Sequence, residues 1–308
     1  MNQKELTFMH ARRFFLLALV ILLILAVLPV ADAETVTFGA FSADSEATAL
    51  DLGDVIVKDY NEFCRFLDQF PNLEKVDMFA TKIRAKEINV LAERYPNVEF
   101  GWTMVIVSKD HKHTVRTDAT AFSTLHNNKS TKHSSSDFAI LKYCKNLKAL
   151  DIGHNNVKDL TFLEDLPELR LLILACNAID DITPIASLKH LEYAELFKNN
   201  ITDITPLSGL TSMLDLNICF NRIKDWTPIY SLQKLGRLWI YNSNNYSDDK
   251  PVPKDVVAGL KEALPSTYID STHYSTMGGW REHPHYDIIY EVFKTGVYMP
   301  FEESEPEP

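Results

Sequence analysis

The side chains of this sequence that could do chemistry by their spacing are its paired histidines. His111 and His113 form one pair, His283 and His285 form another, and one residue separates the members of each pair. An imidazole pair holds a metal ion only when further ligands complete the site, and neither pair brings them at a metal-binding spacing. We therefore expect no metal and no cofactor, and interpret both pairs as solvated loop histidines.

The sequence contains none of the local patterns that mark common catalytic or nucleotide-binding sites. No G-x-S-x-G, H-E-x-x-H, P-loop or G-x-G-x-x-G motif is present, so we expect a protein that is not an enzyme. Folding can still assemble a site from distant residues. The alternative is therefore an enzyme or glycan-processing protein whose site joins Trp280, His283, His285 and nearby carboxylates, between the repeats and the C-terminal piece.

Composition limits the class of protein and its partners. The 308 residues are 46% hydrophobic, which suits one large folded domain and excludes overall disorder. Asp and Glu total 42 against 31 Lys and Arg, a net charge of −11, and nucleic acid selects basic faces instead. We expect no nucleic-acid partner. The acidic, Pro-containing tail at 302–308 is predicted to be disordered.

The first 33 residues look like a targeting segment that takes no part in the fold. Lys4, Arg12 and Arg13 precede an apolar run over 14–28, and Ala31-Asp32-Ala33 supplies the small-x-small pattern that signal peptidase reads. The run is shorter than the ~20 residues of a spanning helix. A cleaved signal peptide is favoured over an uncleaved membrane anchor. Both alternatives place the rest of the chain outside the cytoplasm, secreted or at the cell surface.

A repeat of 22 residues organises the middle of the chain. Leu147, Leu169, Leu191, Met213 and Leu235 follow one another at equal steps of 22 residues. Each begins an L-x-x-L-x-L pattern, which makes a short strand with alternate side chains inward, followed by apolar residues at spacing three. Such units bury their apolar faces only by stacking on one another. The predicted fold is an α/β solenoid with short parallel strands on the concave face, helical or 3-10 turns on the convex face, and N- and C-terminal caps.

Two further repeated positions have a structural explanation. An Asn amide can both donate to and accept from the backbone of a tight buried bend, which accounts for the Asn of each turn. The Thr-Pro pairs fit an N-cap followed by Pro at the first helical position. These positions are Asn155, Asn177, Asn199 and Asn221, and Thr183-Pro184, Thr205-Pro206 and Thr227-Pro228.

The four cysteines do not suit disulfide bonds. Cys176 and Cys219 lie two coils apart, and a coil spacing of about 4.8 Å separates them by about 10 Å, beyond the ~7 Å limit for a bridge. Cys144 takes an apolar core position, and Cys64 lies in an amphipathic stretch upstream. Although export favours pairing, we predict no disulfide.

These repeats resemble the 22-residue leucine-rich repeats of internalin-like surface proteins of Gram-positive bacteria. The close resemblance covers residues 138–245, about a third of the chain. It implies a curved solenoid at the cell surface that binds a partner, usually a protein. The chain has few repeats and shows no wall-sorting signal, so the resemblance does not extend to a specific role in adhesion or invasion.

The flanks of the repeats are less regular. We expect an N-terminal cap with irregular repeats at 34–107, a polar insertion at 108–137 that projects as a loop or hairpin, and a C-terminal cap with an aromatic tail at 246–301. Phe122 and Leu125 leave open a degenerate unit inside the insertion. In the C-terminal piece, helices are predicted over 251–264 and around Tyr286 to Phe293, the second stopping at Gly296.

The outward side chains of the concave face carry the functional prediction. Aromatic residues and Arg are concentrated there, as they are in interfaces. The candidate partner-binding residues are Tyr193, Phe197, Phe220, Arg237, Trp239 and Tyr241. The leading hypothesis is an extracytoplasmic, non-catalytic module for a protein or peptide, with a glycan as the other ligand class and a structural envelope component as a further alternative. Either a partner or the chain's own C-terminal tail or insertion could cover these aromatic rings.

Overall fold

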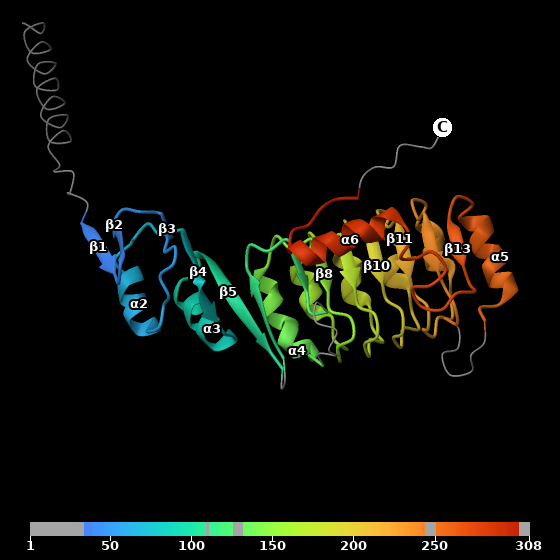
Figure 1. Cartoon of the computed structure of the whole chain (residues 1–308), viewed down its shortest axis with the longest axis horizontal. Helices are drawn as coiled ribbons and strands as arrows, with labels where there is room; N and C mark the ends of the chain where they lie inside the picture. The colour runs from blue at the N-terminus through green and yellow to red at the C-terminus, as the bar shows by residue number, and fades with distance from the viewer. Residues whose placement is uncertain (1–33, 109–110, 126–131, 244–250, 302–308) are drawn as a thin grey trace, which may run out of the picture.

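The computed structural model describes residues 34–108, 111–125, 132–243 and 251–301 as an elongated body (Figure 1). The predicted targeting segment and the acidic tail at 302–308 lie outside the described residues. Within the described ranges, no helix is both long and apolar enough to cross a membrane.

The N-terminal third combines a hairpin with a small mixed sheet and two helices. Asp59 starts the first of these helices, because its side chain accepts hydrogen bonds from the backbone N–H groups of Asn61 and Glu62. The sheet has the order β3-β4-β5-β6, with β6 antiparallel to β5 and the other pairs parallel. The elements are β1 (Thr35–Phe38), β2 (Phe41–Asp44), β3 (Ala49–Asp51), α2 (Tyr60–Leu67), β4 (Lys75–Ile83), α3 (Ala85–Arg94), β5 (Glu99–Val107) and β6 (Lys112–Arg116).

The rest of the chain forms a parallel sheet of seven three-residue strands in the order β13-β12-β11-β10-β9-β8-β7. Tyr193 aligns with Leu171 on one side and Asp215 on the other, which is the 22-residue register of the sequence. Short 3-10 helices return on the convex side, so the predicted leucine-rich repeat solenoid is confirmed. The elements are β7 (Ala121–Ser123), α4 (Ser135–Phe138), η1 (Ala139–Tyr143), β8 (Ala149–Asp151), η2 (Thr161–Asp165), β9 (Leu171–Ile173), η3 (Thr183–Ser187), β10 (Tyr193–Glu195), η4 (Thr205–Leu207), β11 (Asp215–Asn217), η5 (Thr227–Ser231), β12 (Arg237–Trp239), α5 (Lys254–Ala263), β13 (Tyr268–Asp270) and α6 (Pro284–Thr295).

The sheet extends beyond the predicted repeat range at both ends. Ala121 pairs with Ala149, so β7 lies inside the range 108–137 that the sequence assigns to an insertion, and Phe122 does belong to a degenerate unit. At the other end β13 pairs with β12, inside the range assigned to the C-terminal cap. The steps to these two strands are longer than 22 residues. A search at a fixed period therefore ends one strand too early at each end.

The turns follow the predicted chemistry in one respect and depart from it in another. Asn199 accepts from Ile179 N–H at 3.1 Å and donates to the carbonyls of Leu174 and Leu196 at 3.0 Å, as predicted for the Asn positions. The Thr of Thr-Pro is not the N-cap. Instead Asp203, two residues earlier, accepts from the Thr205 N–H at 2.8 Å. A carboxylate is a stronger acceptor than a hydroxyl and reaches the first free N–H of the turn.

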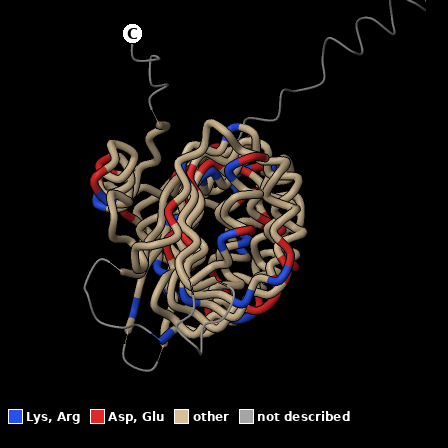
Figure 2. The backbone as a smooth tube through the Cα atoms, turned by 90° about the vertical axis from the view of Figure 1, so that its right-hand side faces the viewer, with Lys and Arg blue, Asp and Glu red and all other residues tan. Residues whose placement is uncertain are grey.

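The C-terminal segment, residues 271–301, turns back over the concave face after β13. Helix α6 ends at Gly296, which adopts a left-handed φ of 72° as predicted for a helix stop. Beyond it, the Tyr298 N–H donates to Thr120 Oγ1 at 2.9 Å, next to the first strand of the sheet. Figure 2 shows the coils end-on, with this segment on one side of them. A second apolar cluster, separate from the solenoid interior, lies between the coils and this segment.

Candidate functional site

The predicted partner-binding aromatic residues lie mostly beneath the C-terminal segment. Tyr193 and Trp239 are fully buried, Phe197, Phe220 and Arg237 are nearly so, and Tyr241 is half-buried. Of the two alternatives for these side chains, the structure shows coverage by the chain's own C-terminal tail. These side chains therefore do not form an open surface in this structure, because their rings pack against another segment of the same chain; their role in binding a partner stays a prediction.

Trp280 is the anchor of that internal interface. Its ring packs between Tyr193 and Trp239, with ring centroids 5.4 and 5.0 Å away. Its Nε1 donates to Glu195 Oε1 at 2.7 Å, and the Trp239 Nε1 donates to the Met277 carbonyl at 2.9 Å. A buried aromatic side chain whose polar atom is hydrogen-bonded is held in one position and one orientation, so Trp280 holds the C-terminal segment against the sheet.

A buried ionic network holds the same segment. Arg237 Nε donates to Asp215 Oδ1 at 2.6 Å, and His285 Nδ1 lies 2.5 Å from Asp215 Oδ2. Arg237 also donates to the Trp280 carbonyl at 3.1 Å. These hydrogen bonds to His285 and Arg237 hold the pKa of Asp215 below its usual value, although burial opposes them. Phe301 stacks on His285 with ring centroids 4.1 Å apart and closes the network from outside.

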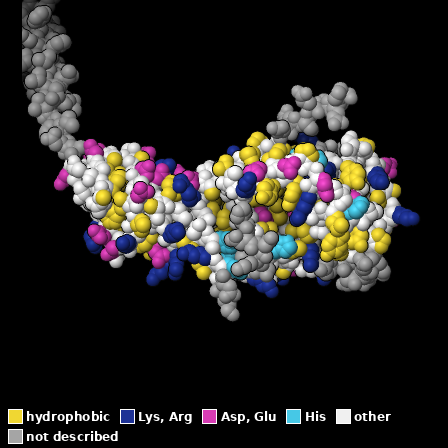
Figure 3. All heavy atoms as spheres, in the orientation of Figure 1, with side chains coloured by type: hydrophobic (Ala, Val, Ile, Leu, Met, Phe, Trp, Pro, Cys, Tyr) yellow, Lys and Arg dark blue, Asp and Glu magenta, His cyan; other side chains and the backbone are white. Residues whose placement is uncertain are grey.

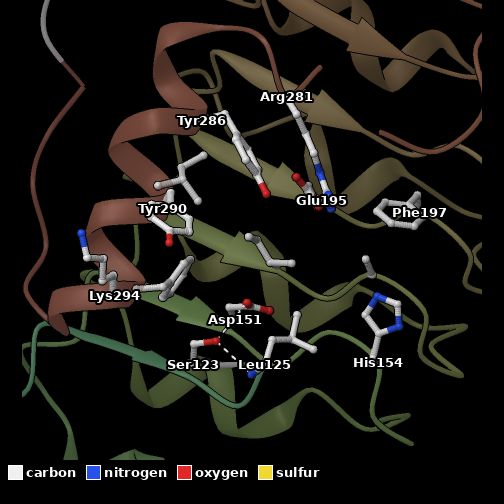
Figure 4. Close-up of a pocket in the computed structure, with 14 residues that line it drawn as sticks. Ser123, Leu125, Asp151, His154, Glu195, Phe197, Arg281, Tyr286, Tyr290 and Lys294 are labelled. Atoms are coloured by element: carbon white, nitrogen blue, oxygen red, sulfur yellow. Dashed lines mark hydrogen bonds between the residues drawn. The ribbon is translucent and has the colours of Figure 1, made fainter. Parts of the chain in front are cut away.

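Beside the covered residues, the concave face keeps an open hollow of about 730 Å³ between the sheet and α6 (Figure 4). We call it the hollow. Its floor is formed by strand residues of β7 to β10, and its wall by aromatic residues of α6 together with Arg281. The lining residues are Ser123, Leu125, Asp151, His154, Ile173, Ala175, Glu195, Phe197, Arg281, Tyr286, Ile289, Tyr290, Phe293 and Lys294. In the space-filling view, apolar side chains are interspersed with charged ones and histidines on the face of the solenoid that it shows (Figure 3).

Asp151 lies in the floor of the hollow and is only 6% exposed. Ser123 Oγ donates to its Oδ2 at 3.0 Å, and the Gly153 N–H donates to its Oδ1 at 3.1 Å. Burial is the strongest influence on this carboxyl and outweighs both hydrogen bonds, so its pKa rises to about 7. A carboxyl group that titrates near neutral pH at the floor of a hollow is a candidate binding group.

Glu195 lies two strands away from Asp151 and is 3% exposed. Its Oε1 accepts from both Tyr193 Oη and Trp280 Nε1. No side chain or N–H in the described part of the chain donates to its Oε2. Burial raises the pKa of this carboxyl as well, against the lowering effect of those hydrogen bonds. Glu195 therefore joins the covered network through one oxygen and the hollow through the other.

Two cationic side chains border the hollow. Lys294 is paired with Glu291 on its own helix, with Nζ 2.8 Å from Oε1. Arg281 is exposed and extends toward the floor beside Glu195 (Figure 4). Among the ion pairs of the described residues, none joins Arg281 to Asp151 or Glu195. The positive charge of Arg281 lowers the pKa of both carboxyls, but less than burial raises it.

One histidine of each pair, His113 and His285, lies in regular structure, so the interpretation as loop residues is wrong for these two; His111 and His283 lie outside the strands and helices. His113 is on β6 and packs against the buried His133, with ring centroids 5.2 Å apart. His285 is on α6 and bonds Asp215, so one of the predicted acid–histidine contacts exists, but neither His283 nor His285 lines the hollow. Within the described ranges, no three His, Cys, Asp or Glu side chains are grouped to hold a metal ion.

All four cysteines are free thiols. Cys144 is fully buried, and burial raises the pKa of its thiol to about 12.

A smaller hollow of about 270 Å³ adjoins the first. The two hollows share His154, Phe197 and Arg281 as lining residues, and the half-buried Cys176 lines the smaller one.

Of the six predicted binding residues, only Phe197 lines the hollow, and Phe220 lines the smaller one. Sequence reasoning named neither Asp151 nor Glu195 as a site residue. The signal that could have found them was their place in the repeat. Both occupy the third position of a strand, which faces outward, and an acid there is buried only when something covers the face.

Comparisons with known proteins agree with this architecture. Residues 145–187 match the family described as Leucine Rich repeats (2 copies). This range includes β8 and β9 with the 3-10 turns η2 and η3 that follow them. No curated protein sequence matches the chain. The repeat match and the register of the sheet place the middle of the chain in the leucine-rich repeat class.

The solved structures similar to the chain include internalins and other leucine-rich repeat proteins. Internalin C2 of Listeria monocytogenes is 21% identical, with 67% of this chain and 74% of that chain covered and a TM-score of 0.39. A leucine-rich repeat protein of Leptospira interrogans is 16% identical, with 67% and 74% covered and a TM-score of 0.29. The ectodomain of the Arabidopsis receptor kinase HAESA, solved with a peptide hormone, is 17% identical, with 67% and 27% covered and a TM-score of 0.35.

Proposed function

We propose that this protein is a non-catalytic binding module that takes a protein or peptide segment into the hollow between its sheet and α6. The observation that carries the proposal is the hollow itself. It is a concave space walled by aromatic side chains, and a few polar groups converge on its floor. Binding sites in proteins have this composition, and leucine-rich repeat proteins typically bind their ligands on the concave surface of the solenoid.

The exposed aromatic residues of α6 support a partner of peptide type. Tyr290 is 60% exposed although it lines the hollow, and Tyr286 and Phe293 are partly exposed beside it. Tyrosine combines an apolar ring with a hydroxyl and is enriched where proteins bind other proteins. The predicted aromatic concave face thus contributes Phe197 to the proposed site, while Tyr193, Arg237 and Trp239 hold the wall in place.

The cellular location is part of the proposal and rests on the sequence of residues 1–33. A basic start, an apolar run and a small-x-small site support an exported, extracytoplasmic protein. The four equal steps of 22 residues likewise support assignment to the internalin-like type of repeat.

Panning a random peptide library against the immobilised full chain tests this function. We expect selected peptides whose affinity falls at least fivefold in Tyr290→Ala. The matched control is Tyr268→Ala, since Tyr268 is 57% exposed on β13 and lies outside the hollow. Selected peptides that bind Tyr290→Ala as tightly as the unchanged protein would remove the hollow as the binding site.

The same immobilised protein can be tested against a glycan array, because aromatic walls and carboxyl groups also suit sugars. Binding of a glycan in place of any peptide would replace the proposed ligand class. Assembly of the chain into oligomers without any ligand would instead favour a structural component of the envelope.

A further inference from the structure

The floor of the hollow carries two acidic side chains, Asp151 and Glu195, and neither forms an ion pair with a side chain in the described part of the structure. Asp151 and Glu195 occupy equivalent positions of β8 and β10, and Ile173 of β9 lies between them in the register. Two strand spacings of about 4.8 Å place the two positions about 10 Å apart. Both side chains are more than nine-tenths buried, and both line the hollow.

Each carboxyl keeps an acceptor position free toward the hollow. Asp151 receives one hydrogen bond on each oxygen, from Ser123 and the Gly153 N–H. Glu195 receives both of its hydrogen bonds on Oε1, and its Oε2 takes none from the residues that the structure describes. A buried carboxylate normally has a paired cation or a full set of donors, because the charge is otherwise costly. When these carboxyls are ionised, a cation from outside, or a side chain that can move in, would supply the missing partner.

The walls of the hollow suit the body of a basic side chain. Tyr286 and Tyr290 present rings on one side and Phe197 lies on the other (Figure 4), and Phe293 of the same helix α6 also lines the hollow. The methylene stem of Lys or Arg packs against such rings, and its head group also gains from cation–π contact. A guanidinium donates two parallel hydrogen bonds to a carboxylate and adds a full positive charge, a combination that a neutral ligand cannot offer.

We propose that the hollow recognises basic peptide segments, with an Arg or Lys head group at Asp151 and a second one toward Glu195. This inference rests on the proposed peptide-binding function and names the chemistry of its ligand. A basic ligand supplies the donors that Asp151 and Glu195 lack and displaces water from an aromatic-walled space.

Arg281 then acts as the chain's own competitor for the two acids. Its guanidinium extends into the hollow beside Glu195, and it is exposed and free of an ion pair among the described residues. Arg281 also makes a cation–π contact with Tyr286, with its guanidinium carbon 5.3 Å from the ring centroid. A bound basic side chain must share the acids with Arg281 or move it aside. Removal of Arg281 should therefore strengthen binding of a basic peptide.

The test measures binding of four synthetic peptides to the full chain by isothermal titration calorimetry at pH 8. The reference is Ac-Gly-Arg-Ser-Gly-Arg-Gly-amide, and the others replace both Arg by Lys, by citrulline or by Glu. Citrulline keeps the size and planar shape of Arg and can still donate hydrogen bonds, but it has no charge and carries a carbonyl oxygen in place of one nitrogen. We expect the Arg and Lys peptides to bind, the citrulline peptide to bind at least about tenfold more weakly, and the Glu peptide not to bind.

Two protein variants should change the affinity for the Arg peptide in opposite directions. Asp151→Asn should weaken the Arg peptide at least about tenfold, whereas Arg281→Gln should strengthen it severalfold. Asp180→Asn and Arg222→Gln make the same charge changes on exposed residues outside the hollow and should leave the affinity within about twofold. Because Arg281→Gln is expected to gain affinity, misfolding cannot imitate its result.

Equal binding of the Arg and citrulline peptides would overturn this inference, as would weaker binding of the Arg peptide to Arg281→Gln. Failure of the ligand class remains distinct from failure of the proposed function. Library peptides that depend on Tyr290 but contain no excess of Arg or Lys would leave the function standing and remove only the basic ligand.

Discussion

On the concave face, Asp215 lies in the part that the C-terminal segment covers, and Asp151 lies in the part that it leaves open. Asp215 bonds Arg237 and His285 and has a lowered pKa. Asp151 bonds only a hydroxyl and a backbone N–H and has a pKa raised to about 7. The two carboxyls share one sheet and nearly the same burial, so the difference comes from their partners.

This contrast separates structural acids from candidate binding acids on one surface. A buried carboxylate with a cation and donors around it holds two parts of a protein together. A buried carboxyl without a cation makes the folded state less stable when it ionises, which is typical of functional sites.

Removal of the anchor should have the largest effect. Trp280→Ala takes a fully buried ring from between Tyr193 and Trp239 and leaves Glu195 without one of its donors. We expect the free energy of unfolding to fall by about 4 kcal/mol, as for other buried aromatic residues. Urea denaturation followed by fluorescence measures it. A loss below about 1 kcal/mol would show that the C-terminal segment is not held through this side chain.

Breaking the ionic network should cost somewhat less. Asp215→Asn leaves the Arg237 guanidinium buried without its counter-ion, which typically costs about 3 kcal/mol at pH 7. The folded-state pKa of Asp215 is lowered, so its contribution is present above the unfolded pKa and is lost as pH falls through the folded value. The difference between the two proteins should shrink below about pH 4. A difference that is independent of pH would contradict the role of the carboxylate charge.

In the open part of the concave face, removal of a carboxylate charge should stabilise the folded protein instead of destabilising it. The folded-state pKa of Asp151 lies above its unfolded value, so the folded protein binds the extra proton between these two values and loses stability as pH rises toward 8. Asp151→Asn keeps the size and an acceptor without the charge. We expect this variant to be more stable than the unchanged protein by on the order of 1–2 kcal/mol at pH 8, and by little at pH 4. Thermal unfolding at the two pH values measures this, and a destabilised variant at pH 8 would refute the assignment.

The smallest effect should come from the convex side, which neither part of the concave face contacts. Asp203→Ala removes the acceptor for the Thr205 N–H at the start of η4. A lost cap of this kind costs about 1 kcal/mol. Thr205→Val should cost less, because the Thr205 hydroxyl makes no capping hydrogen bond there. Equal losses of unfolding free energy in the two variants would show that the Thr205 side chain caps the turn as much as Asp203 does.

The solenoid fold could be predicted from the sequence, because the period of a repeat gives the register in which its strands pair. Equal steps of 22 residues determine which residues pair, and the Asn positions follow from the backbone groups of each bend. The longer steps to β7 and β13 carry no such signal. A strand of three residues is too short to recognise without the period that leads to it.

The site could be predicted only in part. The outward positions of the strands were correctly identified, but the sequence cannot say which of them a later segment covers. Trp280 and Tyr193 are far apart in the chain, and their contact depends on where α6 folds back. Asp151 could not be identified for the same reason: its place in the repeat shows that it faces outward, but its burial follows only from the position of the segment that covers it.

Methyl NMR of isoleucine-labelled protein tests the central claim most directly, that partners bind in the open part and not on the covered aromatic residues. Ile173 and Ile289 line the hollow, whereas Ile218 and Ile240 lie in the solenoid interior next to the covered part. The probe is the tightest peptide from the library, added to saturation. If partners bind in the open part, the methyl signals of Ile173 and Ile289 shift while those of Ile218 and Ile240 stay in place. Shifts confined to Ile218 and Ile240, or to the exposed Ile56 of the N-terminal third, would contradict it.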